Sequence, residues 1–161
     1  MKVLNKVNLS LLVILILLIG LNFWPTNSGY HPLSNIDAKD IVTISLTQAN
    51  GHSINFIKEN SDWLFTHNKE VKLDQDKINK LLGILITHQY RRFENTKQNR
   101  EAFDLDKPRY QIKLNNTEIL FGTTEPIEHL RYILIKNDIY LITDLYLQYL
   151  QANEDSFIKS S

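Results

Sequence analysis

Hydrophobic and polar residues alternate over short stretches of the chain, and this pattern predicts β-strands joined by tight turns. Apolar residues occupy every second position from Val42 to Leu46, which is typical of a half-buried strand. The dipeptide Asn50-Gly51 favours a hairpin turn, and residues 60–62 (Asn-Ser-Asp) favour a second turn. We therefore expect an antiparallel meander of three strands, over residues 41–47, 53–58 and 62–67.

The hydrophobic spacing changes from two to about 3.6 residues in the next segment. Residues 74–89 predict an amphipathic helix, with Asp74 as its N-cap. Residues 95–106 are polar and without period, and they predict a loop or one irregular helical turn. The helix should bury one stripe of five residues, Ile78, Leu81, Leu82, Leu85 and Ile86.

The last third of the chain returns to strand-like alternation and ends in a short helix. Hairpin turns, rather than crossover helices, separate these strands, so the sheet is expected to be antiparallel. The prediction is an α+β domain over residues 41–151, with a meander-type sheet and two helices packed on one face. Its second half would contain strands at residues 110–114, 118–121, 130–136 and 139–143 and a helix at residues 144–151.

The N-terminal segment has a different character, because residues 7–24 contain no charge. As a helix they would be about 27 Å long, close to the bilayer core of about 30 Å. Lys2 and Lys6 precede the segment and the next basic residue is Lys39, so the positive-inside rule places the N-terminus in the cytoplasm. We expect a single-pass helix in the bacterial inner membrane, with the C-terminal domain periplasmic or otherwise extracytoplasmic.

Two alternatives to this anchor remain open. A cleaved signal peptide would need small residues at a cleavage site, whereas Leu-Asn-Phe-Trp-Pro follows Gly20. A buried core helix is the other alternative, although the length and terminal position of the segment argue against it. The expected organisation is thus an anchor (residues 1–24), a flexible tether (25–40), the domain (41–151) and a frayed polar tail (152–161).

Composition narrows the possible functions. The 161 residues include 18 basic and 18 acidic side chains, and this balance argues against a nucleic-acid partner. The absence of cysteine excludes disulfides, thiolate metal sites, a cysteine nucleophile and a lipid-modified cysteine. What remains is an anchored domain with a mixed surface.

No pattern of residues predicts catalytic, cofactor-binding or metal-binding residues. No Gly-x-Ser-x-Gly elbow or phosphate-binding loop occurs, and Asp104 and Asp106 are interpreted as turn formers. The basic residues between Arg91 and Arg109 would form either a contact patch for an acidic partner or anionic envelope polymer, or a solvated face compensated by neighbouring acids; the solvated face is favoured. The five histidines show no metal-ligand spacing: His31, His52, His67, His88 and His129.

The tyrosines near the C-terminus leave two interpretations open. Together with neighbouring leucines they provide more apolar surface than one short helix can bury on a single face. They would serve either in the core or as an exposed patch for a partner, and core packing is favoured. The tyrosines concerned are Tyr132, Tyr140, Tyr146 and Tyr149.

Several short motifs, in this order, resemble a bacterial family known as domain of unknown function 4340. Residues 103–110 (Phe-Asp-Leu-Asp-Lys-Pro-Arg-Tyr) resemble its linker-to-strand motif, with Asp104 in place of the usual glycine. Gly122 resembles its strand-ending glycine, and Trp63 its tryptophan before the first helix. Arg131-Tyr132, followed by Asp138-x-Tyr140-Leu141-Ile142, resembles its last hairpin. The resemblance covers about residues 41–150.

The resemblance implies an N-terminal membrane tether and, for some members, a place beside transporter-like assemblies linked to gliding motility or export. It implies no catalytic residues. We therefore expect a non-enzymatic accessory or scaffold domain, bound to the lipid bilayer through residues 7–24 and to an envelope protein. The alternative is a module that binds a peptide or glycan through the loops at residues 95–106 or 122–129.

Overall fold

The computed structural model describes residue 11 and residues 29–160. The predicted anchor at residues 7–24, Leu11 apart, and the start of the predicted tether lie outside the described residues. No helix within the described residues is long and apolar enough to cross a bilayer. The transmembrane segment therefore stays a prediction.

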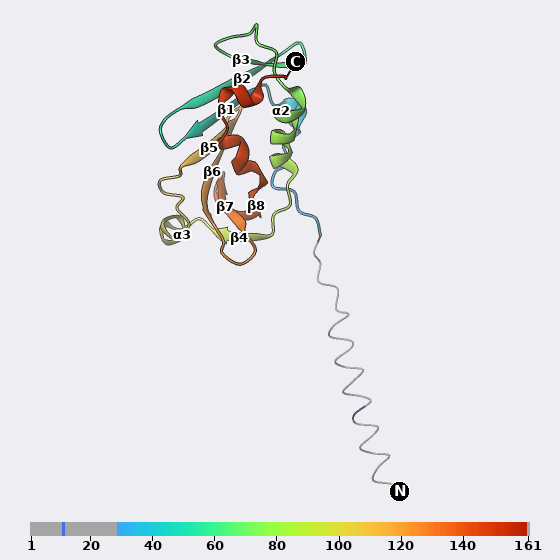
Figure 1. Cartoon of the computed structure of the whole chain (residues 1–161). Helices are drawn as coiled ribbons and strands as arrows, with labels where there is room; N and C mark the ends of the chain where they lie inside the picture. Colours follow the sequence, from blue (N-terminus) through green and yellow to red (C-terminus); the bar gives the residue numbers. More distant parts are fainter. Residues whose placement is uncertain (1–10, 12–28, 161) are drawn as a thin grey trace.

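Residues 29–160 form one antiparallel sheet of eight strands, in the order β3-β2-β1-β5-β6-β7-β8-β4 (Figure 1). Neighbours in sequence are mostly neighbours in the sheet, because tight hairpins join them. This confirms the antiparallel α+β prediction. The strands are β1 (Thr43–Gln48), β2 (Ser53–Glu59), β3 (Asp62–Phe65), β4 (Arg91–Glu94), β5 (Tyr110–Leu114), β6 (Thr117–Thr124), β7 (Leu130–Ile135) and β8 (Asp138–Thr143).

Strand β4 was not predicted from the sequence. Its residues, Arg-Arg-Phe-Glu, contain one apolar side chain and give no alternation. The strand forms by pairing with β8 at the sheet edge, with Phe93 opposite Ile139. An edge strand exposed to solvent needs little apolar character, which explains why hydrophobic period alone missed it.

The predicted helix at residues 74–89 is shorter than expected. Helix α2 (Gln75–Leu82) continues only as a 3₁₀ turn, Gly83–Ile86, before the backbone becomes extended at Thr87. The Asp74 side chain accepts a hydrogen bond from the Lys77 N–H at 3.1 Å, which confirms the predicted N-cap.

The other helices are short. Helix α3 (Lys97–Ala102) forms the helical turn predicted within residues 95–106. The C-terminal helix consists of a 3₁₀ turn, Asp144–Tyr146, followed by α4 (Leu147–Leu150). Two further 3₁₀ turns lie at Ala38–Asp40 and Glu154–Phe157.

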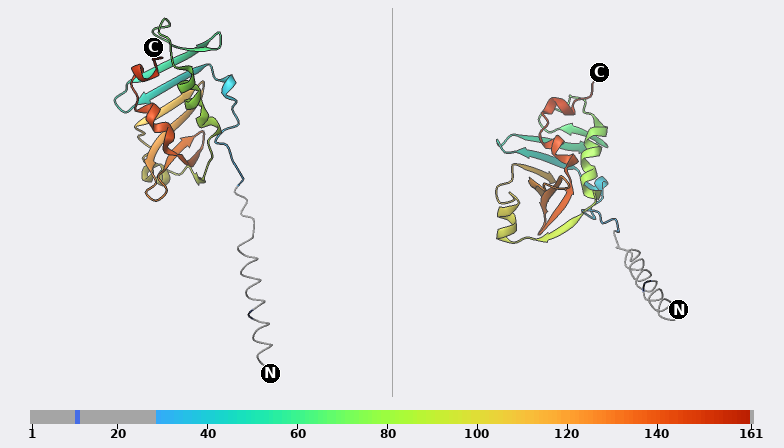
Figure 2. Two further views of the ribbon diagram at one scale, coloured as in Figure 1. Left: turned by 45° about the vertical axis from the view of Figure 1, so that its right-hand side comes forward. Right: turned by 60° about the horizontal axis from the view of Figure 1, so that its bottom comes forward.

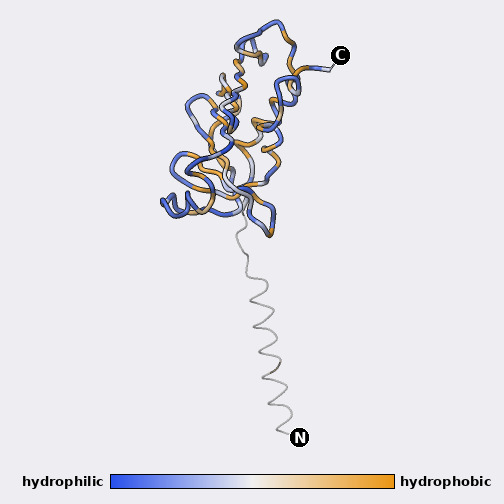
Figure 3. The backbone as a smooth tube through the Cα atoms, turned by 60° about the vertical axis from the view of Figure 1, so that its left-hand side comes forward, coloured by the Kyte–Doolittle hydropathy of each residue, from blue (hydrophilic) through white to orange (hydrophobic). Residues whose placement is uncertain are grey.

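Helices α2 and α4 cover one face of the sheet and bury the main core, as predicted (Figure 2). Four residues of the predicted stripe, Ile78, Leu81, Leu82 and Leu85, are buried against the strands, and burying each such side chain stabilises the fold by about 1.5–3 kcal/mol. The prediction is wrong for Ile86, which is 60% exposed because the helical spacing ends in the 3₁₀ turn before Thr87. Figure 3 shows hydrophobic stretches through the middle of the domain and hydrophilic ones along the outer loops. The largest buried side chains include Trp63, Phe56, Phe65, Phe157, Ile78 and Leu81.

A second, smaller core lies on the opposite face, which the sequence did not predict. The segment after α3 folds back over β6, β7 and β8, and Leu105 is 2% exposed there. Helix α3 itself stands apart from α2 and α4 in Figure 2. The second core contains Phe93, Phe103, Leu105, Leu120, Tyr132, Leu134 and Ile139.

The predicted frayed tail is wrong for residues 154–159. Phe157 is fully buried, and its carbonyl accepts a hydrogen bond from the Asp74 N–H at 2.8 Å. The Lys159 N–H donates to the Lys72 carbonyl at 2.9 Å. The polar composition of the tail led to the prediction of fraying, whereas burial of the single aromatic residue Phe157 is enough to hold it on the core.

The predicted flexible tether is also too long. Leu33 is buried, and backbone hydrogen bonds join residues 31–34 to residues 85–89. Pro32 and His88 form an antiparallel bridge within this short ladder. The turn-rich composition of residues 25–40 suggested a linker, but residues 31–40 belong to the folded domain.

Candidate functional site

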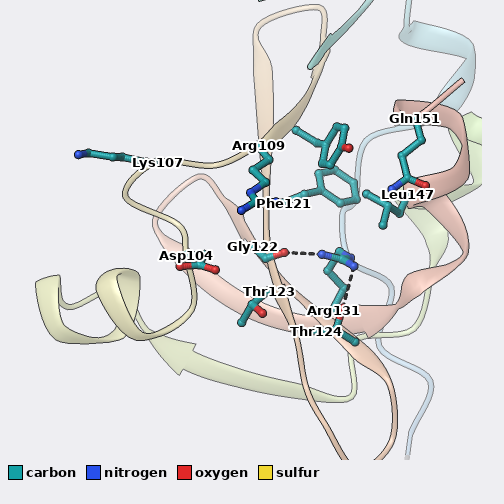
Figure 4. Close-up of a pocket in the computed structure, with 11 residues that line it drawn as sticks. Asp104, Lys107, Arg109, Phe121, Gly122, Thr123, Thr124, Arg131, Leu147 and Gln151 are labelled. Carbon is teal, nitrogen blue, oxygen red and sulfur yellow. Dashed lines mark hydrogen bonds between the residues drawn. The ribbon is translucent and has the colours of Figure 1, made fainter. Parts of the chain in front are cut away.

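A hollow of about 560 Å³ opens where β5 and β6 approach α4 (Figure 4). Its wall combines the two loops that the sequence singled out for ligand binding. The segment after α3 contributes Asp104, and the end of β6 contributes Gly122 and the two threonines beside it. The lining residues are Asp104, Lys107, Arg109, Tyr110, Phe121, Gly122, Thr123, Thr124, Arg131, Leu147 and Gln151.

An irregular register in β6 shapes this hollow. The pairing of β6 with β7 shifts between Phe121 and Thr124, as in a β-bulge. The family resemblance implied that Gly122 ends its strand. The structure differs, because β6 continues to Thr124. A Cβ at Gly122 would lie 2.0 Å from the Phe103 carbonyl oxygen. Glycine is required because the two backbones touch at this point.

Arg131 is the most enclosed charged residue of the site, with its side chain 11% exposed. Its guanidinium donates to both carboxylate oxygens of Asp144, with an Nη2–Oδ2 distance of 3.1 Å. It also donates to the Gly122 carbonyl oxygen and, at 2.7 Å, to the Thr124 hydroxyl (Figure 4). One side chain thus joins β6, β7 and the start of the C-terminal helix.

The basic rim of the hollow comes from the segment that leads into β5. Lys107 and Arg109 are exposed, and in Figure 4 the Lys107 side chain points away from the cavity. Asp104 has φ +56°, a left-handed conformation that glycine adopts most easily. The turn that the resemblance assigns to glycine is therefore kept here by an aspartate.

The family-like motifs meet in space behind the hollow. The rings of Phe103 and Tyr132 stack with centroids 3.9 Å apart and an interplanar angle of 5°. Phe93 packs edge-on against Phe103 at 5.2 Å. The Thr123 N–H donates to the Phe103 carbonyl at 2.9 Å. Three separate sequence motifs thus form one support for the wall of the hollow.

The remaining candidate residues lie elsewhere. Among the described residues, no group of three or more His, Asp or Glu side chains could hold a metal ion. His67 lies 3.4 Å from Glu154. His31 and His88 are neighbours, since the His31 N–H donates to the His88 Nδ1 at 3.4 Å, and His88 also stacks on Tyr30 at 5.7 Å.

The basic stretch forms exposed ion pairs, as the interpretation of a compensated face implies. Arg92 contacts Asp138 at 2.7 Å, Lys97 contacts Glu101 at 3.6 Å, and Arg100 contacts Asp106 at 3.2 Å. These pairs lie at the surface and are worth little to stability.

The C-terminal tyrosines pack against the two cores. Tyr140, Tyr146 and Tyr149 are half-buried against the main core, and Tyr132 belongs to the second core. Burial raises the pKa of the Tyr146 phenol above its usual value, although a hydrogen bond with Thr87 opposes this shift. Burial also raises the pKa of Tyr140, assisted by the negative charge of Asp138.

Sequence reasoning missed the roles of Arg131 and Asp144. The available signal was a charged residue between Leu130 and the apolar run that begins at Tyr132. An arginine inside an otherwise apolar strand requires a partner, and an aspartate after the next strand is a candidate.

Comparison with known proteins identifies one family. Residues 63–161 match the family model described as "Domain of unknown function (DUF4340)". The match begins at Trp63 in β3 and includes the three motifs around the hollow. No curated protein and no solved structure matches the chain.

Proposed function

This chain belongs to the DUF4340 family, whose description states no activity, and we propose that it is a non-catalytic accessory domain of a cell-envelope complex. Residues 7–24 anchor it in the bacterial inner membrane, and its α+β domain lies outside the cytoplasm. The domain holds an envelope protein partner at the hollow beside Arg131. Residues 7–24, uncharged and preceded by Lys2 and Lys6, support this topology.

The observation that supports a non-catalytic function is the set of hydrogen bonds made by the Arg131 guanidinium. Its donors are directed at Asp144, Gly122 and Thr124, all groups of the domain itself. An arginine held in this way fixes the shape of a surface and is not poised to stabilise a reacting group. The site is therefore suited to recognition by shape and charge.

The rim of the hollow is suited to a partner with acidic groups. Lys107 and Arg109 are exposed on one side, whereas Leu147 of α4 and the C-cap residue Gln151 form the other. A volume of about 560 Å³ accommodates a few side chains or a chain end. The two loops that form its wall are held by Gly122 and Phe103, so the surface is formed before a partner binds.

Photo-crosslinking in cells tests this proposal. A photoreactive residue at Arg109 of the full-length chain should give a discrete adduct with one envelope protein. The same residue at Asn79, exposed on α2, is the matched control and should give none. Reversing the charge at Lys107 should reduce the adduct at position 109. A chain recovered under gentle extraction as an isolated monomer, without adducts at either position, would contradict the proposal.

A second candidate function is binding of a peptide or glycan at the same hollow. It is favoured by one observation, the meeting of the two loops expected to bind ligand, through Asp104 and Thr123. Titration of the detergent-solubilised chain with short peptides and glycan fragments, followed by NMR, separates the two functions. Saturable shifts of the Thr123, Thr124 and Arg131 amides would favour a ligand, and no shift with any fragment would exclude those compounds.

A further inference from the structure

A cluster of exposed aromatic side chains lies beside the first residues of the folded domain. Tyr30 stacks on His88 with ring centroids 5.7 Å apart, and His88 contacts Tyr90 edge-on at 4.8 Å. Tyr30 is 62% exposed and Tyr90 55% exposed. Ile86, two residues before His88, is 60% exposed. We call Tyr30, Ile86, His88 and Tyr90 the N-terminal aromatic patch.

The backbone fixes this patch to the domain. The Gln89 N–H donates to the His31 carbonyl at 3.0 Å, and the Leu33 N–H donates to the Thr87 carbonyl at 2.9 Å. The Tyr90 N–H donates to the Leu141 carbonyl of β8 at 2.9 Å. These bonds hold the backbone of Ile86, His88 and Tyr90, whereas Tyr30 precedes the ladder and joins the patch by stacking on His88.

The short ladder limits how far the domain can stand from a membrane. In the proposed function the anchor ends at Trp24, and the first backbone-paired residue is His31. Only six residues, 25–30, separate them, and six extended residues span at most about 20 Å. The predicted tether of sixteen residues would have allowed about 55 Å. The patch therefore remains close to the lipid headgroups.

We propose that the N-terminal aromatic patch rests in the interfacial region of the same bilayer that holds the anchor. This inference depends on the proposed function, since it requires the anchor to be in the membrane. Tyrosine suits the interface because its ring is apolar and its hydroxyl stays hydrated. The domain is then oriented with the β4 edge of the sheet toward lipid and the β3 edge away from it.

The orientation can be measured with single-cysteine labels, because the chain has no native cysteine. An environment-sensitive fluorophore is attached to Tyr90→Cys in full-length protein reconstituted into phosphatidylethanolamine and phosphatidylglycerol vesicles. The matched control is Asn68→Cys, exposed in the segment after β3. Eight strands separated by about 4.8 Å place the two sheet edges about 34 Å apart. A third label at Ile16→Cys reports the anchor.

The emission of the label at position 90 should lie at shorter wavelength than that of the label at position 68. A quencher attached to lipid at the depth of the headgroups should remove most of its intensity. The label at position 68 should respond to aqueous iodide alone. If the label at position 16 is quenched from the lipid but positions 90 and 68 respond equally to iodide, the orientation is wrong and the anchor stands. If position 16 is also open to iodide, both the proposed topology and this inference are wrong.

Discussion

The two halves of the sheet are buried differently. In β1 and β2, buried apolar residues on one face alternate with less buried and mostly polar residues on the other, because only the α2 and α4 side is covered. In β7 and β8 the residues 133–135 and 141–142 are buried consecutively, because the second core covers the other face as well. A strand's hydrophobic pattern thus reports how many of its faces are covered.

The hollow lies along the boundary between these two halves. Tyr110 and Phe121 pair across β5 and β6, where single coverage changes to double coverage. The segment that provides the second cover, Phe103 to Leu105, also touches Gly122. Substitutions at this boundary should therefore be more damaging than similar substitutions in the open half or at the surface.

The largest effect is expected from Gly122→Ala. The added methyl would lie 2.0 Å from the Phe103 carbonyl oxygen, so the segment over the second core must move. The cost should be at least about 3 kcal/mol in the free energy of unfolding, measured with urea. Gly83→Ala is the control, since its methyl meets the Tyr146 hydroxyl at an ordinary 3.5 Å. Because Gly83 has helical backbone angles, Gly83→Ala should be more stable than the unsubstituted protein by about 0.5–1 kcal/mol. Equal stability of the two variants would contradict this account.

The next effect is expected from Arg131→Met. This change removes the link between β6, β7 and the C-terminal helix and leaves the Asp144 carboxylate and the Gly122 carbonyl without their donor. The expected loss is about 2–3 kcal/mol, because the Arg131 side chain is only 11% exposed and its partners would lose a charged donor. Arg92→Met removes the exposed pair with Asp138 and should leave the urea midpoint nearly unchanged. A similar midpoint for both variants would refute a special role for Arg131.

A smaller effect is expected from Phe103→Leu. The substitution keeps an apolar side chain but removes the stacking on Tyr132 and the edge contact with Phe93. The loss should be about 1 kcal/mol. Hydrogen exchange should show where it acts: the Thr123 amide, bonded to the Phe103 carbonyl, should exchange faster, whereas the Leu46 amide in β1 should be little affected. Uniformly faster exchange across the sheet would argue against two separate cores.

The smallest effect concerns alkaline pH. Burial raises the pKa of Tyr146 above its unfolded value of about 10, so folding favours the neutral phenol. The associated stability is fully present below pH 10 and is lost as the pH rises through the folded-state pKa. Tyr146→Phe should therefore flatten the decline in stability above pH 10, measured from urea midpoints. An unchanged slope in Tyr146→Phe would show that this phenol does not contribute.

Much of the fold followed from hydrophobic period and turn residues. The strands around Ile44 and Ile112 and the helix capped by Asp74 were predictable because each has a local signal. Strand β4 and the folding of residues 31–34 onto residues 85–89 were not, since both depend on pairing between distant segments. The frayed tail was mispredicted because the burial of Phe157 is a tertiary contact.

The hollow was predictable only in part. The two loops were identified, but the contact between Gly122 and Phe103 that joins them requires three-dimensional proximity. The role of Arg131 depends on Asp144, thirteen residues away in the chain and joined to it across the β7–β8 hairpin. Sequence pattern identifies the types of residue in such a site, and only the fold shows which of them meet.

The central claim is that the domain lies outside the cytoplasm on a retained N-terminal anchor. Fusion of alkaline phosphatase, which is active only outside the cytoplasm, to the C-terminus of the full-length chain tests it most directly. We predict full phosphatase activity that remains with the membrane fraction. An inactive fusion, or activity released into the soluble fraction from a chain shortened near residue 30, would contradict the account.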